Sequence, residues 1–301
     1  MTGLAGEEPQ CSADASSQHA AAARTGTRTG TAAGTAAGTA AERTLEGSVA
    51  LVTGGSRGLG REMVLAFAQA GADVMITSRK LAGCEALADE VRRTTGRRAF
   101  PYAAHVGDWD GLTGMVDAAY GEFGHLDVLV NNAGIAPLYP SLEQVSEALF
   151  DKVMAVNLKG PFRLTALVGS RMARDGGGSI INVSSVASIR PTPRDLPYAA
   201  AKAGLNTLTT GFALAFGPAV RVNTIMAGPF FTDISEAWDA EAFEALARRF
   251  PLRRGGQPSE IVGAALYFAS RASSFTTGAV LTVDGGQATT PYDADIVHSL
   301  P

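Results

Sequence analysis

Tyr198 and Lys202 stand four residues apart in the alanine-rich stretch "YAAAKAG". At this spacing two side chains share one face of a helix, about one turn apart. A free phenol has a pKa of about 10, and a fixed ammonium group beside it favours the phenolate and lowers that pKa. The pair therefore predicts a general acid–base group that operates near neutral pH. The spacing alone is also compatible with a partly buried tyrosine beside a snorkelling lysine.

The segments that must position this pair alternate between short β-branched runs and longer helical stretches. We expect strands at 49–53, 73–77, 98–104, 126–130, 179–184, 220–225 and 280–284, and helices at 59–70, 81–95, 109–123, 143–174, 197–216 and 258–271. Apolar strands that alternate with helices predict a parallel sheet covered on both faces. With right-handed crossovers, residues 45–301 then form a single α/β domain of the doubly wound Rossmann type, with seven parallel strands.

Residues 1–44 differ in composition from the rest of the chain and carry the repeat "GTAAGTAAGTAA" at 30–41. They contain almost no large apolar side chains, so burial cannot offset the entropy cost of ordering them. We expect a disordered low-complexity tail, with an arginine-containing transit peptide as the alternative.

Bulk composition argues against several classes of function. The net charge of −4 and the pI of about 5.6 argue against a nucleic-acid partner. No apolar run reaches the length of about 18 residues that a membrane span needs. The two cysteines, Cys11 and Cys84, and the four histidines show no metal-ligand spacing. We therefore expect free thiols, no bound metal and a reducing, cytoplasmic location.

The loop "TGGSRGLG" follows the first predicted strand and opens the first predicted helix. Gly54, Gly58 and Gly60 permit a tight turn and let backbone N–H groups approach an anion, to which the helix amino terminus adds its positive dipole end. A glycine cluster alone is a weak signal, but its place after the first strand of an alternating chain strengthens it. The loop predicts a site for a phosphate-bearing ligand.

Five motifs in this order, "TGGSRGLG", "NNAG", "VNLKG", "SS…YAAAK" and "VDGG", resemble those of the short-chain dehydrogenase/reductase family. The resemblance covers roughly residues 45–290 and implies a nicotinamide dinucleotide cofactor. The residues that it assigns to the cofactor are Gly54, Ser56, Arg57, Gly58, Leu59, Gly60, Ser78, Arg79, Val106, Asn132, Ala133, Gly134, Tyr198, Lys202, Gly228 and Thr232.

The same resemblance assigns the chemistry. Ser185 hydrogen-bonds the substrate carbonyl, Tyr198 exchanges a proton with its oxygen, and Lys202 holds the cofactor ribose. Asn157 holds a water that links Lys202 to solvent. The implied reaction interconverts a ketone and a secondary alcohol by hydride transfer. Two alternatives stay open, a catalytically silent NADP-sensing protein and a 3-oxoacyl thioester reductase, whereas the interval between Tyr198 and Lys202 disfavours an enoyl reductase.

The end of the second predicted strand bears on the choice of cofactor. Ser78 stands where an acidic residue would grip the adenosine ribose and repel a 2′-phosphate. Arg57 and Arg79 can clamp such a phosphate, so we expect NADP(H) in preference to NAD(H), with two solvated arginines as the alternative. His105 replaces the aspartate with which the family often binds adenine, and the backbone of Val106 retains its contact.

The segment "PFFTDISEAWDAEAFEALARRF" (229–250) resembles the substrate lid of the family. Its large apolar side chains include Phe230, Phe231, Ile234, Trp238 and Phe243. Because such a lid covers an apolar ligand and excludes water, we expect a free, small to medium, mostly apolar ketone or alcohol. Arg190 and Arg194 can bind a carboxylate or phosphate, but we expect them to be solvated. The helix near 203–216 resembles the dimer helices of the family, and we expect a homotetramer.

Overall fold

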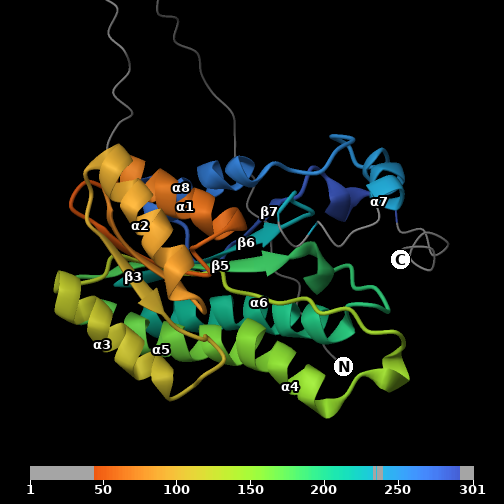
Figure 1. Cartoon of the computed structure of the whole chain (residues 1–301), viewed down its shortest axis with the longest axis horizontal. Helices are drawn as coiled ribbons and strands as arrows, with labels where there is room; N and C mark the ends of the chain where they lie inside the picture. Colours follow the sequence, from red (N-terminus) through yellow and green to blue (C-terminus); the bar gives the residue numbers. More distant parts are fainter. Residues whose placement is uncertain (1–43, 233–234, 236–239, 292–301) are drawn as a thin grey trace, which may run out of the picture. The chain divides into compact units, whose positions relative to one another are not determined.

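The computed structural model of the chain describes residues 44–232, 235 and 240–291 (Figure 1). All of these residues belong to one compact unit. Except for Thr44, the predicted disordered tail lies outside the described residues, and so do Ile234 and Trp238 of the predicted lid.

Seven parallel strands form one sheet in the order β3-β2-β1-β4-β5-β6-β7. The strands are β1 (Val49–Thr53), β2 (Asp73–Ser78), β3 (Ala99–Ala103), β4 (Val128–Asn131), β5 (Gly178–Ser185), β6 (Val220–Ala227) and β7 (Val280–Val283). The order reverses between β1 and β4, and ligands of doubly wound sheets bind at the carboxyl ends of the strands beside such a switch point. The predicted seven-stranded parallel sheet is confirmed.

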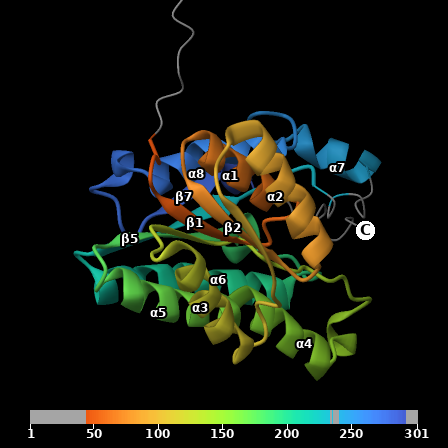
Figure 2. The same cartoon turned by 60° about the vertical axis from the view of Figure 1, so that its left-hand side comes forward.

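Helices cover both faces of this sheet (Figures 1 and 2). One face carries α1 (Gly58–Gln69), α2 (Leu81–Thr95) and α8 (Val262–Ala269), and the other carries α3 (Gly111–Phe123), α5 (Gly160–Met172) and α6 (Leu196–Phe216). Successive side chains of a strand point to opposite faces. Val52 of β1 therefore packs in the core under α1, whereas Leu51 packs in the core under α3 and α5.

A π-helical turn, Ala155–Lys159, separates α4 (Glu147–Met154) from α5. The sequence predicts one continuous helix over 143–174, and the structure corrects this. Pro161 lies in the first turn of α5, where its missing N–H prevents an unbroken α-helical ladder. The wider turn holds Asn157 in a fully buried position. Such turns are frequent at functional sites.

The predicted lid region contains the helix α7 (Ala240–Ala247), which the expected helices do not include. None of the helices in the described ranges is long and apolar enough to cross a membrane. Within the same ranges, no three His, Cys, Asp or Glu side chains gather where they could hold a metal ion.

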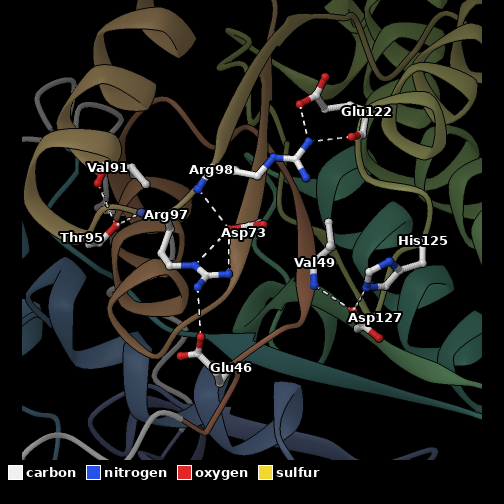
Figure 3. Close-up of polar contacts among 10 residues, drawn as sticks. All are labelled: Glu46, Val49, Asp73, Val91, Thr95, Arg97, Arg98, Glu122, His125 and Asp127. Carbon is white, nitrogen blue, oxygen red and sulfur yellow. Dashed lines mark hydrogen bonds and ion pairs between the residues drawn. The ribbon is translucent and has the colours of Figure 1, made fainter.

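Ion pairs fix the amino ends of the strands (Figure 3). At the start of β2, Asp73 accepts hydrogen bonds from Arg97 Nε (3.0 Å) and from the backbone N–H of Arg98 (3.0 Å). At the start of β1, the Val49 N–H donates to the carboxylate of Asp127 at 2.7 Å. These charged groups therefore hold together the amino ends of the strands, which lie at the opposite end of the sheet from the predicted site.

Candidate active site

Thr53 ends β1 and joins the glycine loop to the loop after β4. Its hydroxyl donates to the Val130 carbonyl (3.1 Å) and accepts from the N–H groups of Asn132 (3.0 Å) and Ala133 (3.1 Å). The Asn132 amide donates back to the carbonyls of Thr53 (2.9 Å) and Gly54 (3.2 Å). Sequence reasoning treated Thr53 only as part of a motif, because its partners lie 77 to 80 positions away.

The glycine loop forms a cradle that side chains would fill. Gly54 has φ +63°, and a Cβ there would lie 2.9 Å from Ala133 Cα. A Cβ on Gly60 would lie 2.3 Å from the Gly54 carbonyl oxygen. Gly58 has φ +54° and begins α1, whose first turn receives no side-chain cap from the preceding residue. The other predicted members of this loop, Ser56 and Leu59, are half-buried. Such a tight turn at an uncapped helix start fits the phosphates of a dinucleotide.

The loops after β6 and β1 come together over this cradle. A Cβ on Gly58 would lie 3.4 Å from Thr232 Cγ2, so the structure brings these two predicted cofactor residues side by side. Thr232 is held by Ser235, which accepts from its N–H (3.0 Å) and donates to its carbonyl (2.6 Å). Gly228 packs against Asp284, and a Cβ on it would lie 2.6 Å from Asp284 Cα.

The residues predicted to select the cofactor lie at the end of β2 and in the glycine loop. Ser78 is half-buried and donates to the Lys80 carbonyl at 3.3 Å. The side chains of Arg57 and Arg79 are exposed. An exposed guanidinium near a ribose-binding position can form charge-assisted hydrogen bonds with a 2′-phosphate.

Val106 follows β3 and is buried, and its backbone lies against the start of α5. A Cβ on Gly160 would lie 2.2 Å from the Val106 carbonyl oxygen, so only glycine permits this approach. His105 accepts a hydrogen bond from the Gly107 N–H through Nδ1 (3.2 Å). Its ring therefore shapes its own turn.

Ser185 and Tyr198 meet at the carboxyl end of β5. Ser185 ends that strand, and its hydroxyl accepts from the Ala187 N–H at 3.2 Å. It lies near the side chain of Tyr198, which is in the first turn of α6. Burial raises the pKa of Tyr198 above its ordinary value, against the smaller lowering effect of Ser185. The expectation of a lowered pKa is therefore wrong for this chain, because desolvation of the phenolate outweighs its stabilisation.

Lys202 lies one turn after Tyr198 and is almost fully buried, with 3% of its surface exposed. Its Nζ donates to the Val183 carbonyl at 2.7 Å and lies 5.7 Å from the centre of the Tyr198 ring. Burial lowers the pKa of Lys202 to about 8. The lysine is thus placed beside the tyrosine as the spacing predicted, and the ammonium form prevails at neutral pH.

Asn157 and Gly134 connect this lysine to the loop after β4. The Asn157 amide donates to the carbonyls of Ile135 (2.9 Å) and Val153 (3.0 Å), and its oxygen accepts from the Ile135 N–H (3.2 Å). A Cβ on Gly134 would lie 2.9 Å from Asn157 Oδ1 and 3.6 Å from Lys202 Nζ. One amide hydrogen and the amide oxygen of Asn157 therefore fix the loop that separates the lysine from the glycine cradle, while the other amide hydrogen bonds within the helix.

A buried polar chain that sequence reasoning missed runs beneath these residues. Asn131 at the end of β4 donates to Asn182 on β5 (2.9 Å), Asn182 donates to Thr209 on α6 (2.9 Å), and Thr209 pairs with Thr224 on β6 (2.6 Å). Buried hydrogen-bond networks hold neighbouring elements in one arrangement, and among the side-chain polar atoms of this one only Asn131 Oδ1 has no partner within the described residues. This chain therefore fixes α6, and with it Tyr198 and Lys202, against the sheet.

The two arginines of the loop before Tyr198 differ in their surroundings. Arg190 donates to the carbonyls of Ala288 (3.0 Å) and Thr290, and so ties this loop to the segment after β7. Arg194 is half-buried and lines a cavity. The expectation of a solvated side chain is wrong for Arg190, whose guanidinium is engaged by backbone carbonyls, and for Arg194 it stays a prediction.

The sequence profile described as "Enoyl-(Acyl carrier protein) reductase" matches residues 54–288 of the chain. The chain belongs to the short-chain dehydrogenase/reductase family, a family of oxidoreductases that bind a nicotinamide cofactor and act on C–OH and C=O groups.

Individual relatives within this family differ in substrate and cofactor. The chain is 38% identical to a 3-oxoacyl-[acyl-carrier-protein] reductase of Thermotoga maritima over 80% of its length and 98% of that protein. A gluconate 5-dehydrogenase from Burkholderia cenocepacia, solved with NADP and tartrate, has a TM-score of 0.79 and 34% identity over 83% of this chain and 98% of that one. A 7α-hydroxysteroid dehydrogenase solved with NADH has a TM-score of 0.78 and 32% identity over 81% and 96%.

Proposed function

We propose that this protein is an NADP(H)-dependent oxidoreductase that interconverts a ketone and a secondary alcohol. The observation that carries the proposal is the placement of Ser185 beside Tyr198, with the buried Lys202 one turn further on and its Nζ 5.7 Å from the centre of the Tyr198 ring. The glycine cradle lies close to it, because Ala133 packs against Gly54 and the next residue, Gly134, lies against Lys202. The loop after β4 thus contacts both the glycine cradle and Lys202.

The chain's own residues divide the chemistry among them. The nicotinamide cofactor, when bound, donates or accepts the hydride. Ser185 donates a hydrogen bond to the substrate oxygen and orients it toward Tyr198, whose phenol gives that oxygen its proton. Lys202 places a positive charge beside the phenol and stabilises the phenolate that is left. Asn157 keeps the neighbouring loop in place through its bonds to Ile135.

The pKa values favour reduction of a ketone at neutral pH. The raised pKa of Tyr198 keeps the phenol protonated, which is the form that donates a proton. Oxidation of an alcohol requires the phenolate instead. We expect kcat/KM for oxidation to rise with pH, and kcat/KM for reduction to fall at alkaline pH as the phenol and the Lys202 ammonium lose their protons.

The preference for NADP(H) is supported by the residues at the end of β2. Ser78 brings no negative charge to the ribose position, and Arg57 and Arg79 are exposed nearby. The solved relatives include complexes with NADP and with NADH, so the choice depends on this chain's own residues.

Turnover of a ketone panel with NADPH and with NADH tests both parts of the proposal. Ketone reduction that is lost in Tyr198→Phe supports the proposed reaction, and a higher kcat/KM with NADPH than with NADH supports the proposed cofactor. A protein that binds NADPH tightly but reduces no ketone would instead be the silent cofactor-sensing protein. Acetoacetyl thioesters belong in the panel because a 3-oxoacyl thioester reductase is among the relatives.

A homotetramer is part of the proposal because two separate faces expose apolar side chains. Beside α5 and α6, Phe162 and Leu214 are exposed, and the outward surface of β7 exposes Val280 and Leu281. Two such faces suit the two kinds of two-fold contact of a symmetric tetramer. Light scattering that gives the mass of a monomer at micromolar concentration would contradict it.

A further inference from the structure

A cavity of about 430 Å³ lies between the loop after β4 and the loop before α6. It is lined by Leu138, Tyr139, Pro140 and Arg194. Its volume falls within the range of small-molecule sites, which are mostly apolar with a few placed polar groups. Here the walls are apolar or aromatic, and the one cationic group among the lining residues is the Arg194 guanidinium.

Tyr139 connects this cavity to the catalytic helix. Its hydroxyl donates to the Pro193 carbonyl (2.9 Å) and accepts from the Leu196 N–H (3.0 Å). Leu196 begins α6, and Tyr198 lies in the same first turn. The cavity therefore borders the amino end of the helix that carries Tyr198, although Tyr198 itself is not among the residues that line it. Because the single proton of the Tyr139 hydroxyl is already donated to Pro193, recognition of an anionic ligand group falls to Arg194.

Arg194 lies in a turn whose hydrogen bonds do not involve its side chain. The Asp195 carboxylate accepts from the Thr192 N–H (2.7 Å), and the Asp195 N–H donates to the Thr192 carbonyl (3.2 Å). Asp195 is therefore directed toward the backbone of its own turn. Within residues 44–232, 235 and 240–291, the structure gives the Arg194 guanidinium no hydrogen bond or ion pair. This sets it apart from Arg190, whose guanidinium is engaged by backbone carbonyls.

We propose that this cavity is a substrate subsite for a carboxylate on an otherwise apolar ketone or alcohol, with Arg194 as the residue that determines specificity. The proposal rests on the proposed function, since it concerns the far end of the same substrate. A guanidinium binds a carboxylate through two parallel hydrogen bonds and balances its single charge. A phosphate carries nearly two charges and would leave one unbalanced beside apolar walls.

The test compares 4-acetylbenzoate with its methyl ester, two aryl ketones that differ only in the charge at the far end. We expect the wild-type enzyme to favour the carboxylate in kcat/KM by about tenfold or more, chiefly through KM, as one charge-assisted hydrogen bond allows. Arg194→Met should bring this ratio close to one, and Arg194→Lys should restore part of it. Arg93→Met, which removes an exposed arginine at the far end of α2, should leave the ratio unchanged.

Calorimetric titration of the full chain with benzoate separates this inference from the proposed function. If neither ketone is turned over but Arg194→Met weakens benzoate binding by about tenfold, the subsite stands and the proposed reaction fails. If the ketones are reduced but the ratio of carboxylate to ester is near one, or is the same in Arg194→Met, the subsite is overturned while the reaction stands. Benzoate binding that is equal in the two proteins would overturn the subsite as well.

Discussion

The two ends of the sheet use charged residues in opposite ways. At the amino end, Asp73 is paired with Arg97 at 2.9 Å, and Arg97 reaches Glu46 at 3.1 Å (Figure 3). At the carboxyl end, Lys202 is buried against a backbone carbonyl and its charge meets no carboxylate among the described residues. The amino end thus compensates its charges with ion pairs, whereas the carboxyl end keeps the Lys202 charge beside Tyr198 without a carboxylate partner in the described part of the chain.

The largest effect that tests this comparison is expected from Tyr198→Phe. Removal of one hydroxyl at the carboxyl end should lower kcat by about 10²- to 10⁴-fold, the usual contribution of a general acid. The affinity for NADP(H) and the melting temperature should change little, because the ring remains. Tyr267→Phe is the matched control. It removes the hydroxyl of a tyrosine in α8 that is hydrogen-bonded to Thr276, and it should keep full activity. A Tyr198→Phe enzyme with more than about a tenth of wild-type kcat would rule out Tyr198 as the proton donor.

Lys202→Met should reverse the usual relation between activity and stability. Turnover should fall by about 10²-fold or more because the phenolate loses its cation. The free energy of unfolding at pH 7 should rise by roughly 1–3 kcal/mol, because a charge whose burial lowers its pKa from 10.5 to about 8 is removed. Chemical denaturation with activity assays on the same samples measures both.

The pH dependence of that stability difference has a fixed sign. Between about pH 8 and 10.5 the unfolded wild-type chain binds a proton at Lys202 that the folded chain lacks. Wild-type stability therefore gains relative to Lys202→Met as the pH rises through this window. A variant that is less stable than the wild type at pH 7 would show that the ammonium is compensated after all.

Arg79→Asp should change which cofactor binds at the carboxyl end of the sheet, without affecting the ion pairs at its amino end. The substitution removes one clamp for a 2′-phosphate and adds a carboxylate that accepts from ribose hydroxyls. We expect the ratio of kcat/KM for NADPH over NADH to fall by about 10- to 100-fold. A wild-type enzyme that already prefers NADH would contradict the assignment from the start.

Asp73→Asn should have a small effect, and only on stability. It weakens the ion pair with Arg97, in which the Asp73 side chain is 15% exposed and the Arg97 side chain 22% exposed. We expect the free energy of unfolding to fall by about 1–2 kcal/mol. The values of kcat and KM should stay as in the wild type. Asp89→Asn removes a partner of Arg92 that is 75% exposed, and should cost less than about 0.5 kcal/mol.

Sequence reasoning reached the fold and the placement of Tyr198 beside Lys202 because the signals for both are local. The period of the apolar residues predicts the strands, and the four-residue interval between Tyr198 and Lys202 predicts their common helix face. The π turn at Ala155–Lys159 escaped it because a helix-period pattern does not reveal where the ladder widens. The pKa direction of Tyr198 escaped it because burial depends on packing that the motif does not contain.

Contacts across long intervals were also beyond reach. Tyr139 meets Pro193 across 54 positions and Arg190 meets Ala288 across 98 positions. Neither pair has a spacing rule, and tyrosine and arginine are common in surface loops. Only the folded chain shows that Tyr139 and Arg190 hold the loop before α6.

The bond from Arg190 to the segment after β7 also affects how this protein's relatives can diverge. Its acceptors are the backbone carbonyls of Ala288 and Thr290, which every residue type supplies. Positions 288 and 290 can therefore accumulate substitutions without weakening the tie, while position 190 is constrained to a long donor. A contact of this kind leaves no paired substitutions in an alignment. An analysis of covariation between positions would therefore not detect the contact between Arg190 and the segment after β7.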